Sequence, residues 1–284
     1  MIPPGETIGI LGGGQLGRMI AMAAAQLGYR CHVFAPEADS IAAEVCAAFT
    51  CARYDDRAAL AAFAADCAVV TYEFENVPVA PLAALAPVPL LPGARALEVA
   101  QDRVSEKRFV EGLGGRPAPW LAVDTAEDLA RALDTIGSPG ILKTRRDGYD
   151  GKGQWRIMTD HDAHGIVVGE QPLVYEGFVQ FSAEFSVILC RGADGGIAFW
   201  DSAENVHEGG ILARSTLPAS ALVQQQVPAA RELAARGVEM KNLIGSEAHD
   251  WAQILADPRN HLHLYGKAAA RPGRKMGHVT RLEL

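Results

Sequence analysis

The sequence predicts an α/β protein in which an N-terminal doubly wound parallel sheet is followed by mixed and antiparallel sheets and a small C-terminal subdomain. The parallel sheet is predicted by a strand, a glycine turn, a helix and a second strand that succeed one another within residues 7–34. The antiparallel part is predicted by short strands on either side of glycine-rich turns between residues 140 and 214. We expect domains at 1–99, 100–240 and 241–284, with a lid subdomain over about 110–175.

Composition and charge exclude several functional classes. The chain has 284 residues, of which 49% are hydrophobic, so it is able to bury a sizeable core. Its 26 basic and 34 acidic residues give a net charge of −8, which argues against a bulk affinity for nucleic acid or an anionic membrane. The five cysteines show no C-x-x-C spacing, and no unbroken apolar run of about 18 residues occurs. We therefore expect a cytoplasmic protein with no nucleic-acid or membrane partner, no zinc site and no disulfide framework.

The first strand leads into a glycine turn at residues 12–17 that fits the pattern G-x-G-x-x-G, and a helix at 18–27 and a strand at 29–34 follow. Such a turn permits close backbone approach and presents backbone N–H groups and a helix N-terminus to an anion. A dinucleotide site would also need an acidic residue at the end of the second strand, where Ala35 and Pro36 stand. The phosphate of another ligand, or close packing of the turn alone, explains the glycines equally well.

A buried strand at 68–71, preceded by a helix at 60–65, delivers two carboxylates to the carboxyl edge of the predicted sheet. Ligands of open α/β sheets bind at that edge, and Glu73 or Glu75 is suited to accept hydrogen bonds from a ligand hydroxyl or amine. A solvated turn is the alternative for both residues. The Pro-rich segment 78–92 is expected to form a loop, a short helix and a short strand that close the first domain.

The second region begins with alternating helices and strands. They are expected at 100–109 (charged helix), 119–123 (strand), 126–136 (amphipathic helix introduced by Thr125), and 140–143 and 156–158 (strands). Between the last two strands, glycines let the backbone approach a ligand, and Lys143 and Lys152 are able to neutralise oxyanions. This pattern predicts a phosphate-handling loop at the tip of a hairpin that folds over a ligand, with an ordinary charged hairpin as the alternative.

The remaining elements are predicted at 183–190, 197–200 and 261–265 (strands) and at 229–236 and 247–255 (helices). Glu184 lies in an otherwise apolar strand, where a carboxylate is either exposed at an edge or kept for a ligand, because burial without a partner is costly. His207, beside the glycine turn within 205–214, is interpreted on its own as a surface histidine. His261 and His263 share one strand face, but without a third ligand we expect no metal site there.

In their order and spacing, these motifs resemble those of the 5-(carboxyamino)imidazole ribonucleotide synthetases, ATP-grasp enzymes of purine biosynthesis, over nearly the whole chain. The segments that carry the resemblance are 12–17, 72–78, 101–103, 143–153, 176–179, 205–214, 240–245 and 265–279. The resemblance implies a preATP-grasp domain, an ATP-grasp domain and a C-terminal subdomain. It also implies ATP and Mg²⁺ as cofactors and a homodimeric assembly.

Site residues are carried over from the resemblance position by position. ATP would be surrounded by Arg103, Lys143, Gly148, Tyr149, Asp150, Gly151, Lys152, Gly153, Glu176, Val179, Glu184 and His207. The substrate 5-aminoimidazole ribonucleotide would be held by Gln15, Leu16, Glu73, Tyr149, Asp150, Lys267 and Arg274. The resemblance further implies that Lys143, Asp150 and His207 are catalytic. It implies that Lys267 and Arg274 grip the 5'-phosphate, for which two cations are chemically suited.

The implied reaction is an ATP-dependent carboxylation. Bicarbonate attacks the γ-phosphate of ATP to give carboxyphosphate and ADP, and the exocyclic amine of the imidazole then traps the carboxyl group as a carbamate. Such phosphoryl transfer depends on positioning and on charge neutralisation. Exclusion of water is equally important, because exposed carboxyphosphate hydrolyses.

The resemblance fails at one junction. Family members continue past the helix near residue 236 with a strand that bears a metal-binding glutamate. An Asn-Glu pair and an Arg-x-His-Asn-Ser-Gly run that binds bicarbonate come next. In this chain none of these residues is present, and Arg236 is followed directly by Gly237. Either a disordered stretch is omitted from the residues shown, or the chain carries a deletion. We favour omission, because a deletion would remove core strands and leave apolar surface and strand edges uncovered. On sequence grounds Glu239 is no replacement for the missing metal ligand.

Three alternatives stay open at this point. A true deletion would leave a catalytically silent nucleotide-binding ATP-grasp protein. An NAD-dependent dehydrogenase rests only on the glycine turn and lacks the acidic residue after the second strand. A related ATP-grasp enzyme that uses formate and glycinamide ribonucleotide fits segments 148–153 and 267–274 less well.

Overall fold

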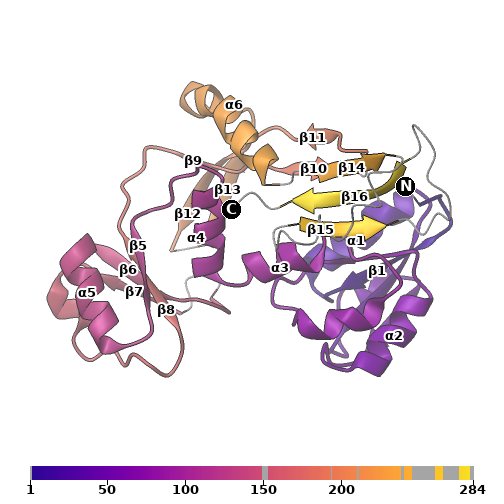
Figure 1. Cartoon of the computed structure of the whole chain (residues 1–284), viewed down its shortest axis with the longest axis horizontal. Helices are drawn as coiled ribbons and strands as arrows, with labels where there is room; N and C mark the ends of the chain where they lie inside the picture. The colour runs from indigo at the N-terminus through magenta and orange to yellow at the C-terminus, as the bar shows by residue number, and fades with distance from the viewer. Residues whose placement is uncertain are drawn as a thin grey trace. The chain divides into compact units, whose positions relative to one another are not determined.

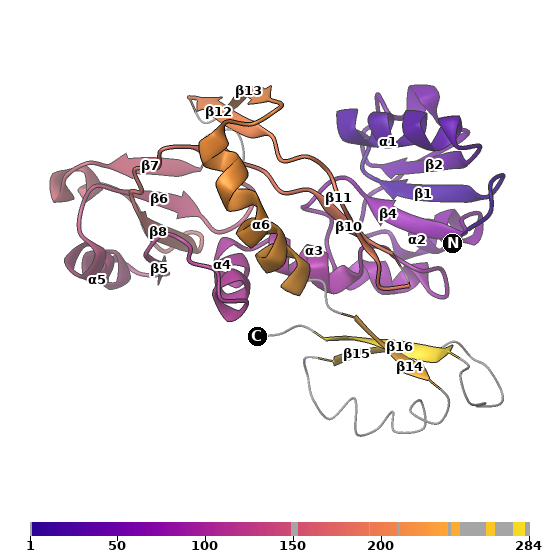
Figure 2. The ribbon, with the colours of Figure 1, turned by 90° about the horizontal axis from the view of Figure 1, so that it is seen from above.

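The computed structural model describes residues 2–148, 153–192, 194–209 and 211–237, and after them the backbone of three strands at 240–244, 260–264 and 275–281. The chain forms two compact units, Met1–Glu106 and Lys107–Leu284, whose elements are labelled in Figures 1 and 2. None of the helices in these described residues is long and apolar enough to cross a membrane.

The first unit contains the predicted parallel sheet. Its strands are β1 (Thr7–Leu11), β2 (Arg30–Ala35), β3 (Ala48–Cys51) and β4 (Val69–Tyr72), in the order β3-β2-β1-β4 with all neighbours parallel. The helical elements are α1 (Gln15–Gln26), η1 (Ala43–Val45), α2 (Arg57–Ala65), η2 (Ala80–Leu85) and α3 (Ala94–Ala100). The sequence did not predict β3, because this short edge strand is only partly buried and lacks apolar alternation.

Both faces of this sheet are covered, as expected for a doubly wound fold. On β1, Ile10 packs into a cluster with the α1 residues Ala21 and Ala24, whereas its neighbour Leu11 belongs to a second cluster with Leu60 and Phe63 of α2. Successive side chains of a strand point to opposite faces, so the two clusters lie on opposite sides of the sheet. The carboxyl ends of β1 and β4 are therefore fixed between two packed layers.

Several element boundaries differ from the prediction because of capping. Helix α1 begins at Gln15, three residues earlier than expected, after an extended Gly14. The single helix expected at 100–109 is divided into α3 and α4 (Arg103–Gly112), because Asp102 turns the chain and accepts hydrogen bonds from the backbone N–H groups of Val104 and Ser105.

The second unit begins with an antiparallel sheet. It consists of β5 (Trp120–Val123), β8 (Leu173–Gly177), β6 (Gly140–Thr144) and β7 (Gln154–Ile157), in that order. Helix α5 (Ala126–Ile136) starts at the predicted residue with a capping box between Thr125 and Asp128. It covers one face through a core that includes Leu129, Leu142 and Tyr175. The opposite face carries the side chains of alternate residues, among them Lys143 and Glu176.

Smaller sheets follow in the second unit. Strands β9 (Glu184–Phe185), β12 (Glu204–Glu208) and β13 (Ile211–Thr216) form one sheet, β10 (Leu189–Arg191) and β11 (Ile197–Phe199) form another, and β14 (Met240–Ile244), β16 (Lys275–Arg281) and β15 (Asn260–Leu264) form a third. The other elements are η3 (Asp160–Ala163) and α6 (Ala221–Arg236). The single strand predicted at 183–190 is wrong, since its two ends pair with different sheets. The helix predicted at 247–255 lies outside the described residues.

Burial makes His32 a pH-sensitive point of the first unit. Its Nε2 lies 2.8 Å from Thr50 Oγ1, and burial lowers its pKa below the ordinary value of 6.5, an effect that the charge of Asp66 opposes. Below that value the unfolded chain binds the proton more readily, so this contribution to stability is complete above about pH 6.5 and is lost as the pH falls toward the lowered pKa. We expect the free energy of unfolding to decrease between about pH 7 and about pH 5, and the decrease to be smaller in His32→Gln. Urea unfolding at a series of pH values gives the free energy of unfolding of both proteins. An equal decrease in the two proteins as the pH falls would contradict the prediction.

Candidate functional site

The side chain of Glu73 lies in the glycine turn, at the carboxyl edge of the parallel sheet in the first unit. Its backbone N–H donates to the carbonyl of Leu11 at 3.0 Å, and its Oε1 accepts a hydrogen bond from the N–H of Gly14 at 2.8 Å. A Cβ atom added to Gly12 would lie 2.6 Å from this Oε1, and one added to Gly17 would lie 2.9 Å from the carbonyl oxygen of Gly12. Gly12 is therefore required by the close approach of the Glu73 carboxylate at the start of α1, where a negative charge is favourable, and Gly17 is required by the close approach of the turn's own backbone.

This arrangement favours one of the two explanations that the sequence left open for the glycines. The turn is closely packed, and the carboxylate of Glu73, not a ligand phosphate, accepts the N–H of Gly14. The positions expected to contact the ribonucleotide, Gln15, Leu16 and Glu73, do lie together around this turn, and the first two are exposed. Of the two candidate carboxylates, Glu73 enters the turn, whereas Glu75 is exposed. The turn is therefore suited to an amine or hydroxyl near Glu73 rather than to a phosphate.

An aromatic pair that the sequence did not indicate lies beside this carboxylate. Tyr54 stacks on Phe74 with ring centroids 6.2 Å apart. Burial, and then the charges of Glu37 and Glu73, raise the pKa of Tyr54 well above its ordinary range, so the phenol is neutral at physiological pH. Tyr54 lies in a turn between β3 and α2, where no periodic pattern points to a role.

In the second unit, Lys143 and Glu176 contact each other on the face of the antiparallel sheet that α5 does not cover. The Nζ of Lys143 lies 3.0 Å from Oε2 of Glu176, on neighbouring strands β6 and β8. Glu176 is buried, and its Oε1 lies 3.2 Å from the Nζ of Lys107 on α4. The sequence analysis did not single out Lys107, because on its own it belongs to a charged helix face, but the structure places it in contact with the predicted site residue Glu176.

The hairpin expected around the basic loop is present. Strands β6 and β7 pair antiparallel, and the N–H of Thr144 donates to the carbonyl of Gly153 at 2.8 Å. Gly153 has a φ of +65°, and a Cβ added there would lie 2.6 Å from Oγ1 of Thr144, so this position requires glycine. Gly148 is described, whereas the site residues 149–152 lie outside the described residues.

A histidine and a carboxylate meet in the sheet formed by β9, β12 and β13. The Nδ1 of His207 lies 3.0 Å from Oε2 of Glu184, and both side chains are about one-third exposed. Next to them, Asn205 donates to the hydroxyl of Ser186 at 2.7 Å and accepts from Ser215 at 2.9 Å. The carboxylate of Glu184 thus lies on the edge strand β9, as one of the two alternatives predicted, and it is paired with His207; a role toward a ligand stays a prediction. His207 lies at the surface, as interpreted from the sequence, but it has a specific acidic partner.

Four further predicted site residues remain, of which two are described and two lie outside the described residues. Arg103 is the first residue of α4, and Val179 lies just after β8 with an exposed side chain. Lys267 and Arg274 lie outside the described residues. The structure therefore describes the two parts of the candidate site separately, one at the glycine turn of the first unit and one on the sheets of the second.

The described residues do not supply a protein-held metal site. Among them, no group of three His, Cys, Asp or Glu side chains is placed to hold a metal ion. Glu176 faces two lysine ammonium groups, and Glu184 faces His207. Because Mg²⁺ requires oxygen ligands in a near-octahedral arrangement, this donor set does not fit it.

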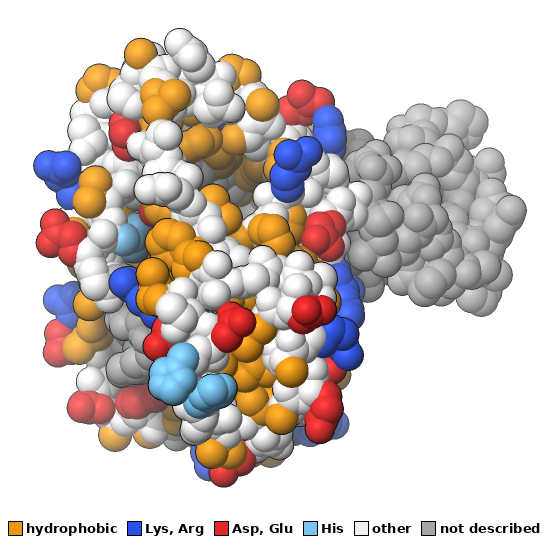
Figure 3. Space-filling model, turned by 90° about the vertical axis from the view of Figure 1, so that its left-hand side faces the viewer, with side chains coloured by type: hydrophobic (Ala, Val, Ile, Leu, Met, Phe, Trp, Pro, Cys, Tyr) orange, Lys and Arg blue, Asp and Glu red, His pale blue; other side chains and the backbone are white. Residues whose placement is uncertain are grey.

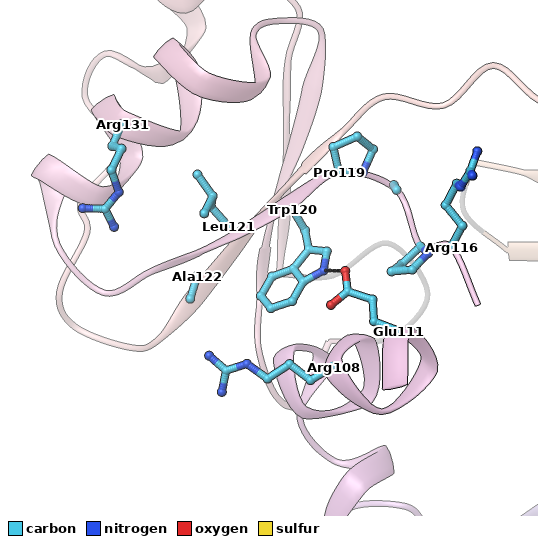
Figure 4. Close-up of a pocket in the computed structure, with 10 residues that line it drawn as sticks. Arg108, Glu111, Arg116, Pro119, Trp120, Leu121, Ala122 and Arg131 are labelled. Atoms are coloured by element: carbon cyan, nitrogen blue, oxygen red, sulfur yellow. Dashed lines mark hydrogen bonds between the residues drawn. The ribbon is translucent and has the colours of Figure 1, made fainter. Parts of the chain in front are cut away.

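A hollow of about 540 Å³ lies beside the same helix that carries Lys107. Figure 4 shows the indole of Trp120 at its centre, with Arg108 and Glu111 of α4 on one side. Trp120 Nε1 donates to Glu111 Oε1 at 2.9 Å, and the guanidinium of Arg108 lies 5.9 Å from the ring centroid. These contacts fix α4 against β5.

Three family models match the chain: the ribonucleotide synthetase preATP-grasp domain at residues 5–101, the ATP-grasp domain at 108–248, and the phosphoribosylaminoimidazole carboxylase C-terminal domain at 239–283. An N5-carboxyaminoimidazole ribonucleotide synthase of Brucella melitensis is 40% identical over 354 aligned positions, which include 99% of this chain and 98% of the relative. The ADP complex of an N5-carboxyaminoimidazole ribonucleotide synthetase is 31% identical with a TM-score of 0.78, and it covers 99% of this chain and 93% of that one. A Staphylococcus aureus synthetase complexed with ADP is 28% identical with a TM-score of 0.77, over 99% and 94% of the two chains.

The continuous sequence decides between the two explanations for the junction after Arg236. The full sequence of 284 residues is continuous there, α6 ends at Arg236 and β14 begins at Met240, so the favoured expectation of an omitted stretch is wrong. With 354 aligned positions against 284 residues, at least 70 positions hold no residue of this chain.

The second unit exposes apolar surface. Its large hydrophobic side chains that are more than one-third exposed include Trp155, Met158, Val167, Phe178, Val179, Phe181, Ile188, Trp200, Val206, Ile211, Leu212, Leu217 and Leu222. Most of them lie between residues 178 and 217, in the part of the chain that forms the sheets β10-β11 and β13-β12-β9. Figure 3 shows one face of the molecule, on which hydrophobic side chains lie in patches between charged ones. Uncovered apolar surface and open strand edges are the consequence expected of a deletion.

Proposed function

The chain belongs to the N5-carboxyaminoimidazole ribonucleotide synthase family of ATP-grasp ligases, and we propose from this that it carboxylates 5-aminoimidazole ribonucleotide at the expense of ATP in purine biosynthesis. The observation that carries the proposal is the 40% identity to a named synthase across the length of both chains. The charged groups on the sheet of the second unit, with Lys143 beside the buried Glu176, support it. The boundaries 1–99, 100–240 and 241–284, with the lid at about 110–175, remain our assignment of its domains.

In this proposal the second unit handles ATP. Lys143 holds phosphate oxygens of ATP and neutralises charge as the γ-phosphoryl group moves to a bicarbonate oxygen and ADP leaves. Glu176 and Val179 line the adenine side. His207, oriented by Glu184 at 3.0 Å, faces the phosphates, and Arg103 and the loop from Gly148 to Gly153 complete the nucleotide site. The family resemblance is the support for these roles.

The first unit and the C-terminal segment hold the ribonucleotide in this proposal. Its exocyclic amine attacks the carboxyl carbon of carboxyphosphate, a new C–N bond forms, and phosphate leaves with the electron pair of the broken C–O bond. Glu73, anchored on Gly14 at 2.8 Å, is placed to accept a hydrogen bond from an amine or hydroxyl of the ribonucleotide. Gln15, Leu16, Tyr149 and Asp150 belong to the same site by resemblance.

Mg²⁺, bicarbonate, a homodimer and a cytoplasmic location are further parts of the proposal, and their support is the family resemblance alone. Magnesium commonly reaches such sites on substrate phosphates and would add charge neutralisation there. Isotopically labelled bicarbonate tests the chemistry: carbon NMR should show a carbamate signal that needs both ATP and the ribonucleotide. Label that stays in bicarbonate would contradict the proposal.

The proposed phosphate grip is tested with Lys267→Ala and Arg274→Ala. Each variant removes a charge-assisted hydrogen bond to the 5'-phosphate, so we expect the KM for the ribonucleotide to rise at least about tenfold and the KM for ATP to change much less. Steady-state kinetics with each substrate varied in turn gives both values. An equal effect on the two KM values would remove this assignment.

A second candidate function is a catalytically silent nucleotide-binding protein. Two observations favour it: at least 70 aligned positions hold no residue of this chain, and the described residues hold no metal site. Such a protein would bind ADP and release no ADP from ATP in response to the ribonucleotide. Nucleotide binding and turnover must therefore be measured separately.

A further inference from the structure

We propose that Lys107 is a positioning residue of the nucleotide site, which holds Glu176 in place and leaves Lys143 available to phosphate. This inference rests on the proposed function and adds a residue to it. Glu176 faces one ammonium group at each oxygen, with Lys107 Nζ 3.2 Å from Oε1 and Lys143 Nζ 3.0 Å from Oε2. The three side chains are only 14%, 20% and 11% exposed for Lys107, Lys143 and Glu176, so solvent screens them weakly.

The charge balance assigns different roles to the two lysines: Lys107 compensates Glu176, and Lys143 binds phosphate. A buried carboxylate is costly when it has no cationic partner, and Glu176 would bind a single lysine tightly. If Lys143 were its only partner, a phosphate would have to compete with the carboxylate for that ammonium group. With Lys107 on the other oxygen, Glu176 remains compensated when Lys143 turns toward a phosphate. The trio carries one formal positive charge in excess, which favours an arriving anion.

The position of Lys107 is fixed by the contacts of its helix. Lys107 and Glu111 are separated by one helical turn and therefore lie on the same side of α4. Glu111 accepts a hydrogen bond from Trp120 at 2.9 Å (Figure 4). Trp120 on β5 in turn pairs in register with Glu176 on β8. The helix is thus held on the strand beside Glu176, and Lys107 reaches the carboxylate from outside the hairpin that carries Lys143.

ADP binding to the full chain, measured by calorimetry, tests the assignment. We expect Lys107→Met to weaken ADP binding about tenfold and Lys107→Arg to restore most of the loss. Arg131→Met removes a cation of the same unit that pairs with Asp128 and not with Glu176, and this variant should bind ADP as the wild type does. If Lys107→Met does not fold, Lys107→Gln gives the same comparison, because it keeps a hydrogen-bond donor and removes the charge.

A double-mutant cycle distinguishes positioning from a merely structural role. In the background of Lys107→Met, the further change Glu176→Gln should restore affinity rather than lower it, which a double-mutant cycle records as coupling. Unchanged ADP affinity in Lys107→Met, or strictly additive losses in the double variant, would overturn the inference alone. A wild-type chain that does not bind ADP would overturn the proposed function with it.

Discussion

Replacing Lys143 with methionine is expected to lower kcat/KM for ATP by about 10²- to 10³-fold, the usual loss when one preorganised charge donor is removed from a transferring group. The protein should still fold, because Lys107 continues to compensate the buried carboxylate of Glu176 at 3.2 Å. Initial rates over a range of ATP concentrations, together with thermal unfolding, measure the two effects.

Arg131→Met is the matched control for that experiment. Arg131 is a cation of the same unit, but it lies on α5, pairs with Asp128, and its side chain is 60% exposed. Its removal changes the net charge equally and should leave kcat/KM within about twofold, since exposed ion pairs contribute little. If Arg131→Met and Lys143→Met lost activity equally, the specific role of Lys143 would be refuted.

Replacing Gly12 with alanine is expected to damage the ribonucleotide site from within the fold. The new Cβ would lie 2.6 Å from Oε1 of Glu73, and Gly12 has a φ of +118°, which L residues rarely adopt. We expect a loss of about 1–3 kcal/mol in the free energy of unfolding from backbone strain. Because Glu73 must also move, the KM for the ribonucleotide should rise more than the KM for ATP.

Gly28→Ala is the control that separates backbone strain from displacement of Glu73. Gly28 also has a positive φ, +80°, but an added Cβ would meet only Pro4 at an ordinary 3.5 Å. This variant should lose stability through the backbone alone and keep the KM for the ribonucleotide unchanged. Chemical denaturation and ribonucleotide kinetics on both variants provide the comparison. A similar rise in KM for Gly28→Ala would show that lost stability, not displacement of Glu73, causes the effect.

Local patterns predicted the elements whose side chains alternate cleanly. The strand β1 and the helix α5 begin and end at the predicted residues, because apolar periodicity and the Thr125 cap define them within a few neighbours. The hairpin of β6 and β7 was predicted for the same reason. The break at Asp102 was not, since whether an acidic residue caps a helix or continues one depends on the backbone around it.

Local sequence patterns did not predict the contacts within the candidate site. The occupant of the glycine turn is Glu73, which stands 59 positions after Gly14, and nothing in the turn itself distinguishes a carboxylate from a phosphate. The same holds for Lys107, whose partner Glu176 lies on a strand of another part of the chain. Long-range pairing decides these contacts, so the sequence indicated the residues of the site one by one without the charge balance between them.

Ribonucleotide-dependent release of ADP is the most direct test of whether this chain is a working ligase. The intact protein is incubated with ATP, Mg²⁺ and bicarbonate, with and without 5-aminoimidazole ribonucleotide, and ADP is followed over time. The proposed function predicts ADP release that depends on the ribonucleotide and requires bicarbonate. A wild-type protein that binds ADP but releases none in response to the ribonucleotide would contradict it, and would identify the chain as the silent nucleotide-binding protein.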